Sequence, residues 1–139
     1  PHVPLEAPQH YIDRFPGAMP ERRRLALAMI ASIDDAVGQV TQTLADEGVV
    51  DNTLIFYLAD NGAPLKYAKR DAPGGGPGWD GSLNDPWIGE KGMLTEGGIR
   101  VPFIASWPAK IPAGQVDDRP VISFDAVATA VAAASGSRV

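Results

Sequence analysis

The sequence contains no cysteine, and this absence excludes disulfide bonds and thiolate chemistry within the chain. Long apolar runs are missing too: the longest, at 25–33 and 121–134, fall short of the roughly 20 residues that a membrane-spanning helix needs. A basic stripe is also missing, because lysine and arginine are scattered apart from the run 22–24 and the net charge is −5. We therefore expect neither a membrane span nor a nucleic-acid binder.

What is present is the composition of a globular protein. The 139 residues suffice for one compact domain, and the 45% apolar and 21% charged residues exclude a disordered chain. The chain begins at Pro1-His2, with neither Met nor a signal peptide, so we expect a piece of a longer protein. No internal repeat or boundary divides it, and residues 1–139 are predicted to form a single segment.

The apolar pattern predicts an α/β fold. Apolar residues spaced three and four apart predict a helix from Glu21 to Glu47, and Gly48 is a natural left-handed stop. The continuous apolar run 53–59 is typical of a strand buried on both faces of a parallel sheet. A second strand is predicted at 101–107 and a short one at 121–123, before a final helix at 126–134 capped by Asp125.

Asp60-Asn61-Gly62 follows the first predicted strand directly. In open α/β sheets, ligands bind beyond the carboxyl ends of the strands, and carboxylate and amide oxygens suit Ca²⁺ or Mg²⁺. The other interpretation is a simple turn closing the strand. Since Ca²⁺ takes about six to eight oxygens, any further ligands would lie outside this chain.

Three further features have both a chemical and an ordinary interpretation. His2 can be a catalyst or, as an isolated histidine more often is, a surface or packing residue. It lies in Pro1-His2-Val3-Pro4, where the flanking prolines restrict the backbone and the range of the imidazole. Lys91, between glycines 89 and 92, can bind an anion or can simply be a solvated loop lysine. The segment 96–100 reads as a turn with an internal Glu96–Arg100 ion pair.

A long glycine-rich loop is predicted between residues 62 and 98, which hold ten of the fifteen glycines. Loops of this length are usually functional or disordered. Trp79 and Trp87 favour an ordered loop and could stack on sugar rings.

Taken in order, these segments resemble the sulfatases, the formylglycine-dependent sulfuric ester hydrolases of the alkaline-phosphatase-like fold. The resemblance covers almost the whole chain. The loop 79–84 resembles the bacterial branch of the family. The matching elements are Pro1-His2-Val3-Pro4, Tyr11-Ile12-Asp13-Arg14-Phe15, Ile33-Asp34-Asp35-Ala36-Val37-Gly38, Asp51-Asn52-Thr53, Asp60-Asn61-Gly62, Gly89-Glu90-Lys91-Gly92, Glu96-Gly97-Gly98-Ile99-Arg100-Val101-Pro102-Phe103 and Trp107-Pro108.

The resemblance implies a role for each matching residue. Asp60 and Asn61 correspond to the second pair of metal ligands, usually for Ca²⁺. His2 corresponds to a histidine that hydrogen-bonds the sulfate ester near the leaving oxygen, and Lys91 to a lysine that binds the sulfate. The segment 96–100 corresponds to a motif that shapes the lysine loop. A sulfated small molecule or glycan is the implied substrate, and export to the periplasm or the medium is the implied location.

Two parts of the family pattern are absent. The sequence has no Cys/Ser-x-Pro-x-Arg motif, from which the formylglycine nucleophile is made, and no first pair of acidic metal ligands. The resemblance therefore implies the C-terminal part of a catalytic domain, inactive by itself. Two alternatives stay open: a phosphodiesterase or phosphonate hydrolase of the same superfamily, and a non-catalytic glycan-binding module.

Overall fold

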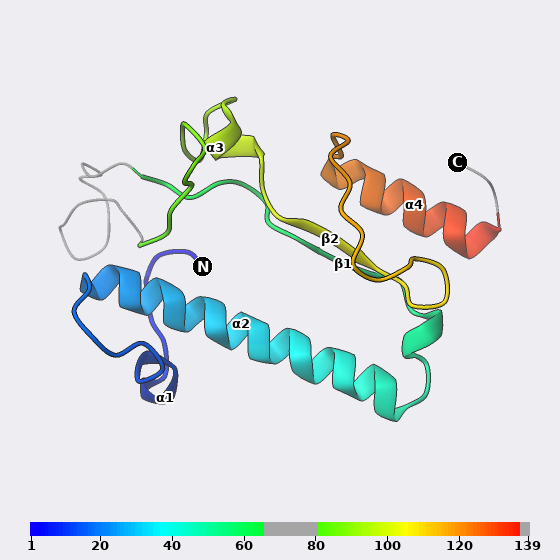
Figure 1. Cartoon of the computed structure of the whole chain (residues 1–139), viewed down its shortest axis with the longest axis horizontal. Coiled ribbons are helices and arrows are strands. Elements are labelled where there is room, and N and C mark those ends of the chain that lie inside the picture. The colour runs from blue at the N-terminus through cyan, green and yellow to red at the C-terminus, as the bar shows by residue number, and fades with distance from the viewer. Residues whose placement is uncertain (66–80, 137–139) are drawn as a thin grey trace. The chain divides into compact units, whose positions relative to one another are not determined.

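The computed structural model describes residues 1–65 and 81–136 (Figure 1). The glycine run 74–78 and Trp79 lie outside the described residues. The elements, in chain order, are α1 (Gln9–Ile12), α2 (Glu21–Asp46), the 3₁₀ turn η1 (Val50–Asn52), β1 (Ile55–Leu58), α3 (Glu96–Ile99), β2 (Phe103–Ser106) and α4 (Ser123–Ser135). The described residues form two compact units, one of residues 1–40, 61–65 and 81–101 and one of residues 41–60 and 102–136, and the division falls within α2.

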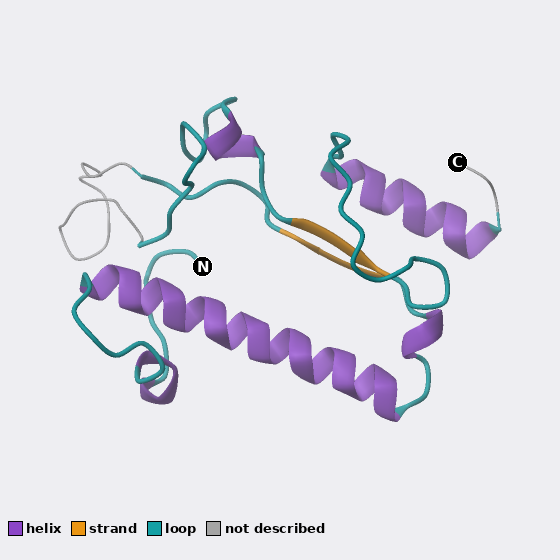
Figure 2. Ribbon diagram, in the orientation of Figure 1, coloured by secondary structure: helices purple, strands orange, loops and turns teal. Residues whose placement is uncertain are grey.

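The helix α2 confirms the long helix predicted from the apolar spacing, and it is the longest helix drawn in Figure 2. The carbonyl of Pro20 accepts the first helical hydrogen bond, from the amide of Arg24 at 3.1 Å. Gly48 ends the helix at φ +68°, as predicted, with its amide bonded to the Ala45 carbonyl. The fully buried side chains of α2 are Ala26 and Ala28, and the rest of its apolar face is partly open.

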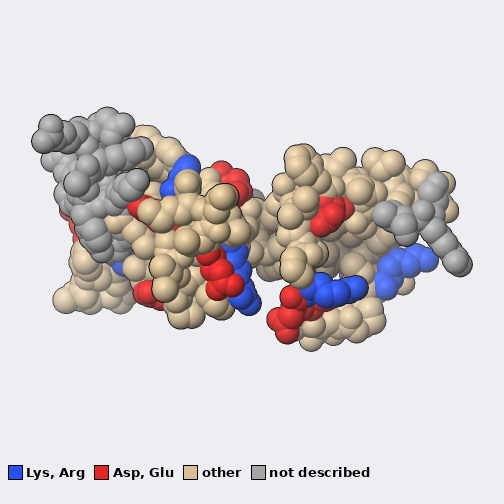
Figure 3. All heavy atoms as spheres, turned by 90° about the horizontal axis from the view of Figure 1, so that it is seen from above, with Lys and Arg blue, Asp and Glu red and all other residues tan. Residues whose placement is uncertain are grey.

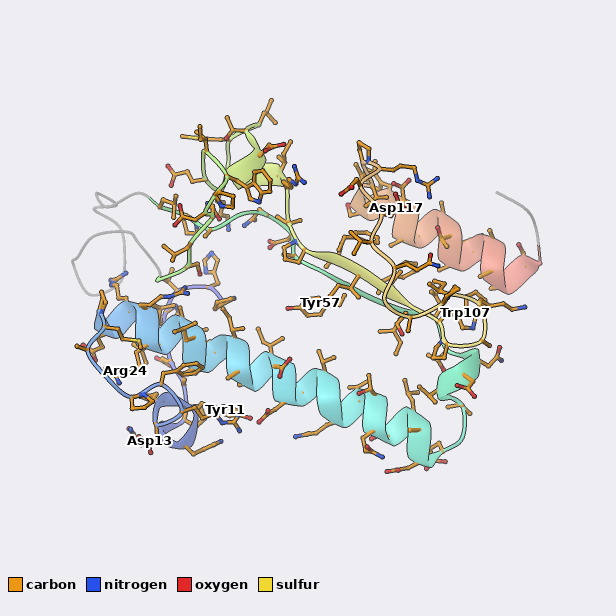
Figure 4. All side chains as sticks on the ribbon, in the orientation of Figure 1. Tyr11, Asp13, Arg24, Tyr57, Trp107 and Asp117 are labelled. Atoms are coloured by element: carbon orange, nitrogen blue, oxygen red, sulfur yellow. The ribbon has the colours of Figure 1, made fainter. Side chains whose placement is uncertain are left out.

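In the first unit, an ion pair joins the turn that follows α1 to α2. The Arg14 guanidinium donates two hydrogen bonds to the Asp35 carboxylate, at 3.1 and 2.7 Å, and stacks over the Tyr11 ring. Figure 4 shows Tyr11 on α1 near α2. The hydrogen bonds from Arg14 hold the pKa of the Asp35 carboxyl below its ordinary value. Asp35 therefore has a structural partner in this unit, the Arg14 guanidinium.

The second unit contains the sheet, and it corrects the predicted strand direction. The strands β1 and β2 pair antiparallel, with Ile55 opposite Ser106 and Leu58 opposite Phe103. The parallel prediction is wrong for this pair, because a continuous apolar run reports burial and carries no information on direction. The two-sided burial of β1 is also not seen in the described chain, where Tyr57 on this strand is 40% exposed. Phe56 and Phe103 pack edge to face across the pair, with centroids 5.9 Å apart.

The C-terminal helix begins earlier than predicted. Residues 121 and 122 form no strand, and α4 starts at Ser123. Asp125 still caps the helix, although from its third position: the carboxylate accepts the Ile122 amide at 2.8 Å. Phe124, Val127 and Val131 of α4 remain largely exposed.

The surface carries both signs of charge. On the face seen in Figure 3, acidic and basic side chains lie interspersed. Within the part of the chain that the structure describes, no helix combines the length and the apolar character that a membrane crossing requires.

Candidate functional site

Lys91 lies at the tip of a tight turn in the first unit. Its amide donates to the Ala63 carbonyl at 3.2 Å, and the amide of Met93 closes the turn on the Glu90 carbonyl at 2.9 Å. Gly92 has φ +87°, a conformation that few other residues adopt. Among the described residues, the Lys91 ammonium has no hydrogen-bond or ion-pair partner, and the side chain is exposed. The backbone is thus fixed while the cation is available to a ligand.

Glu90, next to the lysine, is a buried carboxylate that the sequence did not single out. It is only 7% exposed, and its Oε2 accepts the amide of Leu65 at 2.6 Å. A carboxylate is seldom buried unless it is paired or hydrogen-bonded. Glu90 therefore ties the lysine turn to the segment that follows Asn61. A charged residue in a glycine-rich loop gives no sequence signal of this burial.

Three backbone segments of this unit contact one another at glycines: the segment after Asn61, the segment that leads into the lysine turn, and residues 97–98. The Gly62 amide donates to the Gly98 carbonyl at 2.9 Å, and the Gly97 amide donates to the Ile88 carbonyl at 2.8 Å. A Cβ on Gly62 would collide with the Gly97 carbonyl, and a Cβ on Gly97 would collide with the Gly89 carbonyl. The segment 96–100, predicted as a turn, forms the short helix α3, whose buried residues are these two glycines, 97 and 98. Because glycine has no side chain, α3 can lie against both the lysine turn and residue 62.

Gly97→Ala is expected to destabilise the protein by about 1–3 kcal/mol, because the methyl group meets backbone that cannot move aside without breaking hydrogen bonds. Urea unfolding of the complete protein measures the change. Gly38→Ala is the matched control, since a Cβ there meets nothing within 4 Å on α2. That variant should gain about 0.5–1 kcal/mol from helix propensity. Equal effects of the two substitutions would contradict the packing at Gly97.

Asp60 and Asn61 follow β1, as predicted, but they carry few fixed contacts. The Asn61 Nδ2 donates to the Gly62 carbonyl at 3.0 Å, and no donor among the described residues reaches its Oδ1. Within the described residues, the Asp60 carboxylate is exposed and has no hydrogen-bond or ion-pair partner. No group of three or more His, Asp or Glu that could hold a metal occurs in the described part of the chain. These two residues thus offer hard oxygen donors but not a complete metal shell.

His2 is exposed near the chain start. Its Nδ1 lies 2.9 Å from the Val3 carbonyl, and because a carbonyl only accepts, this bond places the proton on Nδ1. Nε2 is then the nitrogen available to a ligand. A backbone hydrogen bond joins the lysine turn to the segment after Asn61, whereas in the described residues no hydrogen bond joins His2 to Lys91 or Asn61.

The predicted ion pair between Glu96 and Arg100 is confirmed, and Arg100 also stacks on Trp87, one of the two tryptophans of the predicted loop. Its Nη1 lies 3.2 Å from the Glu96 carboxylate, and its guanidinium stacks 4.0 Å from the centroid of the Trp87 ring. One face of Trp87 is therefore taken by a cation of this chain. Trp79, the other tryptophan considered for sugar stacking, lies outside the described residues.

Known proteins match this chain both in sequence and in structure. The family model described as Sulfatase matches residues 1–137. The chain is 35% identical to human (Homo sapiens) N-acetylgalactosamine-6-sulfatase over 105 residues, which are 76% of this chain and 18% of that protein. It is 36% identical to rat (Rattus norvegicus) steryl-sulfatase over 102 residues, covering 72% of this chain and 16% of that protein.

A solved structure is similar over the full chain. It is the crystal structure of Ps i-CgsB in complex with k-i-k-neocarrahexaose, which matches with a TM-score of 0.83 and 33% sequence identity. The match covers 100% of this chain and 28% of that one. The chain thus spans less than a fifth of the human and rat relatives and about a quarter of the solved protein.

Proposed function

The chain belongs to the sulfatase family, and from this premise we propose that it supplies the sulfate-binding and part of the metal-binding residues of a sulfuric ester hydrolase. In this proposal it forms the C-terminal part of a bacterial-type catalytic domain of the alkaline-phosphatase-like fold. The sequence has no Cys/Ser-x-Pro-x-Arg motif, so the formylglycine would come from a segment outside residues 1–139. The isolated segment would then be inactive.

The observation that carries the proposal is the joining of the lysine turn to the segment after the strand end. The Lys91 amide bonds the carbonyl of Ala63, two residues beyond Asn61, while its ammonium is left unpartnered among the described residues. A fixed backbone with an available cation suits the binding of a sulfuryl oxygen. Such a preorganised cation stabilises charge without reorganising during the reaction.

Asp60 and Asn61 fit a hard cation by the chemistry of their donors. The Asp60 carboxylate and the Asn61 Oδ1 are oxygen ligands of the type that Ca²⁺ or Mg²⁺ prefers. When bound, the cation would polarise the sulfate ester as a Lewis acid. Further oxygens from outside the described residues would have to complete its shell, because Ca²⁺ takes about six to eight.

His2 is proposed to protonate the leaving oxygen. With the proton of Nδ1 held by the Val3 carbonyl, Nε2 is the atom that would carry the transferable proton in the imidazolium form. The proposed roles are therefore distinct. Asp60 and Asn61 hold the metal, Lys91 binds the sulfate, and His2 assists departure of the alcohol.

The proposal is tested by measuring sulfate release by the complete open reading frame, co-expressed with a formylglycine-generating enzyme. An aryl sulfate and a sulfated oligosaccharide are assayed with added Ca²⁺, with Mg²⁺ and with a chelator. We expect turnover that the chelator removes and that Ca²⁺ restores.

Each other outcome points elsewhere. Cleavage of phosphate diesters without sulfate release would indicate a phosphodiesterase of the same superfamily. Saturable binding of the sulfated oligosaccharide without turnover of any substrate would favour a glycan-binding module. Either result would overturn the proposed hydrolase.

A further inference from the structure

We propose that Asn84 is a positioning residue, whose side-chain amide holds the Lys91 turn against the segment that follows Asn61. This inference rests on the proposed function for its catalytic consequence. Its structural part, that one amide joins the two backbone segments, is testable without any turnover.

The Asn84 side chain pairs with the backbone of Ala63 as a second peptide group would. Its Oδ1 accepts the Ala63 amide at 2.8 Å, and its Nδ2 donates to the Ala63 carbonyl at 2.9 Å. Because the amide and the carbonyl of Ala63 both bond the same side chain, Asn84 fixes the orientation of residue 63 as well as its distance from Asn84. Both of these bonds are partly buried, where an unpaired backbone group is costly.

The second Nδ2 proton reaches the lysine turn. It donates to the Gly89 carbonyl at 3.0 Å, two residues before Lys91. The Lys91 amide in turn donates to the same Ala63 carbonyl that Asn84 binds. The Ala63 carbonyl therefore receives one bond from Asn84 and one from the lysine turn, and Asn84 spans the two segments directly.

Asparagine meets these requirements in a way that its closest substitutes do not. The three bonds require one acceptor and two donors from a short side chain, and the amide supplies all three. Aspartate keeps the acceptor but places its second carboxylate oxygen against the two carbonyls that Nδ2 binds. Alanine removes all three bonds, and the Ala63 carbonyl then keeps only its bond from the Lys91 amide.

Asn84 is also held in place by its own backbone. Its carbonyl accepts the Trp87 amide at 2.8 Å, which closes a turn between residues 84 and 87. Independently of Asn84, the Glu90 carboxylate accepts a hydrogen bond from the Leu65 amide. Loss of Asn84 should therefore loosen the lysine turn without releasing it completely, and a graded effect is expected.

The experiment compares Asn84→Asp and Asn84→Ala in the complete protein, with Gln42→Ala as control. The control removes another side-chain amide bond of 2.8 Å, from Gln42 to Asp46 on the exposed surface of α2. Hydrogen–deuterium exchange is followed in peptides covering 61–65, 86–93 and α2, and kcat and KM are measured on an aryl sulfate. The alanine variant keeps the test valid if the introduced carboxylate prevents folding.

We expect amide exchange in 61–65 and 86–93 to become about tenfold faster in both Asn84 variants, with α2 unchanged. We expect kcat/KM to fall about 10–100-fold, since a displacement of about 1 Å costs as much as 100-fold. In a Lys91→Ala background the same substitution should cost little more, because its effect passes through the lysine. The Gln42 variant should change neither measurement.

The results separate this inference from the proposed function. Unchanged exchange in the two peptides would overturn it, and so would an equal loss of kcat/KM with and without Lys91. If the unsubstituted protein releases no sulfate, the proposed function fails alone. Faster exchange in the Asn84 variants would then still establish that the amide holds the turn.

Discussion

Replacing Asp60 by alanine is expected to lower Ca²⁺-dependent sulfate release by about 1,000-fold, because a metal that stabilises transition-state charge contributes several kcal/mol. Asp60 is the one carboxylate at the end of the segment carrying β1, and Asn61 supplies only a neutral oxygen beside it. Asn61 cannot replace the lost charge. The loss should appear in kcat/KM measured at fixed Ca²⁺, and part of it should return at higher Ca²⁺.

Metal binding provides a measurement that does not need turnover. A ligand that binds only the folded protein raises its stability with concentration, so Ca²⁺ should raise the melting temperature of the unsubstituted protein. Asp60→Ala should shift that dependence to much higher Ca²⁺. Asp46→Ala is the matched control, because Asp46 is an exposed carboxylate at the end of α2 bonded to Gln42. If both variants respond to Ca²⁺ like the unsubstituted protein, Asp60 is not a ligand.

The parts of the fold that sequence predicts best are those fixed by local chemistry. The apolar spacing and Gly48 give α2 nearly to its ends, and the predicted Glu96–Arg100 pair forms between residues four apart. Asp125 caps α4 because its carboxylate needs only a backbone amide three residues away. Each of these features depends on neighbours within one or two turns of chain.

Strand direction and burial could not be predicted in the same way. The residues of β1 read as a buried parallel strand, yet their partner β2 runs antiparallel and Tyr57 stays partly open. The same apolar run is compatible with either direction, since side-chain periodicity does not depend on the direction of the neighbouring strand.

The candidate site shows the same division. Asp60, Asn61, His2 and Lys91 come from short motifs, and their roles remain proposals that experiments must decide. Asn84 and Glu90 have no such signal, because their partners lie 21 and 25 residues away in the chain. Their importance appears only when the backbone amides of Ala63 and Leu65 are followed to the groups that satisfy them.

Lys91→Ala is expected to reduce kcat/KM for an aryl sulfate by about 100–1,000-fold, the usual cost of removing one preorganised group that stabilises transition-state charge. The substitution removes an exposed side chain beyond Cβ, and the turn itself is held by backbone bonds of Lys91 and Met93. Stability should therefore stay within about 0.5 kcal/mol of the unsubstituted protein. Lys110→Ala serves as the control, since that exposed lysine lies in the turn after β2.

Lys91→Arg distinguishes a positioned point charge from a general positive field. An arginine keeps the charge but presents a wider, planar group that cannot occupy the place of an ammonium. If Lys91 contacts a sulfuryl oxygen, the arginine variant should recover only a small part of the activity, and inorganic sulfate should inhibit it less than the unsubstituted protein. Full recovery in Lys91→Arg would mean that charge alone matters, and unchanged activity in Lys91→Ala would remove the lysine from the sulfate site.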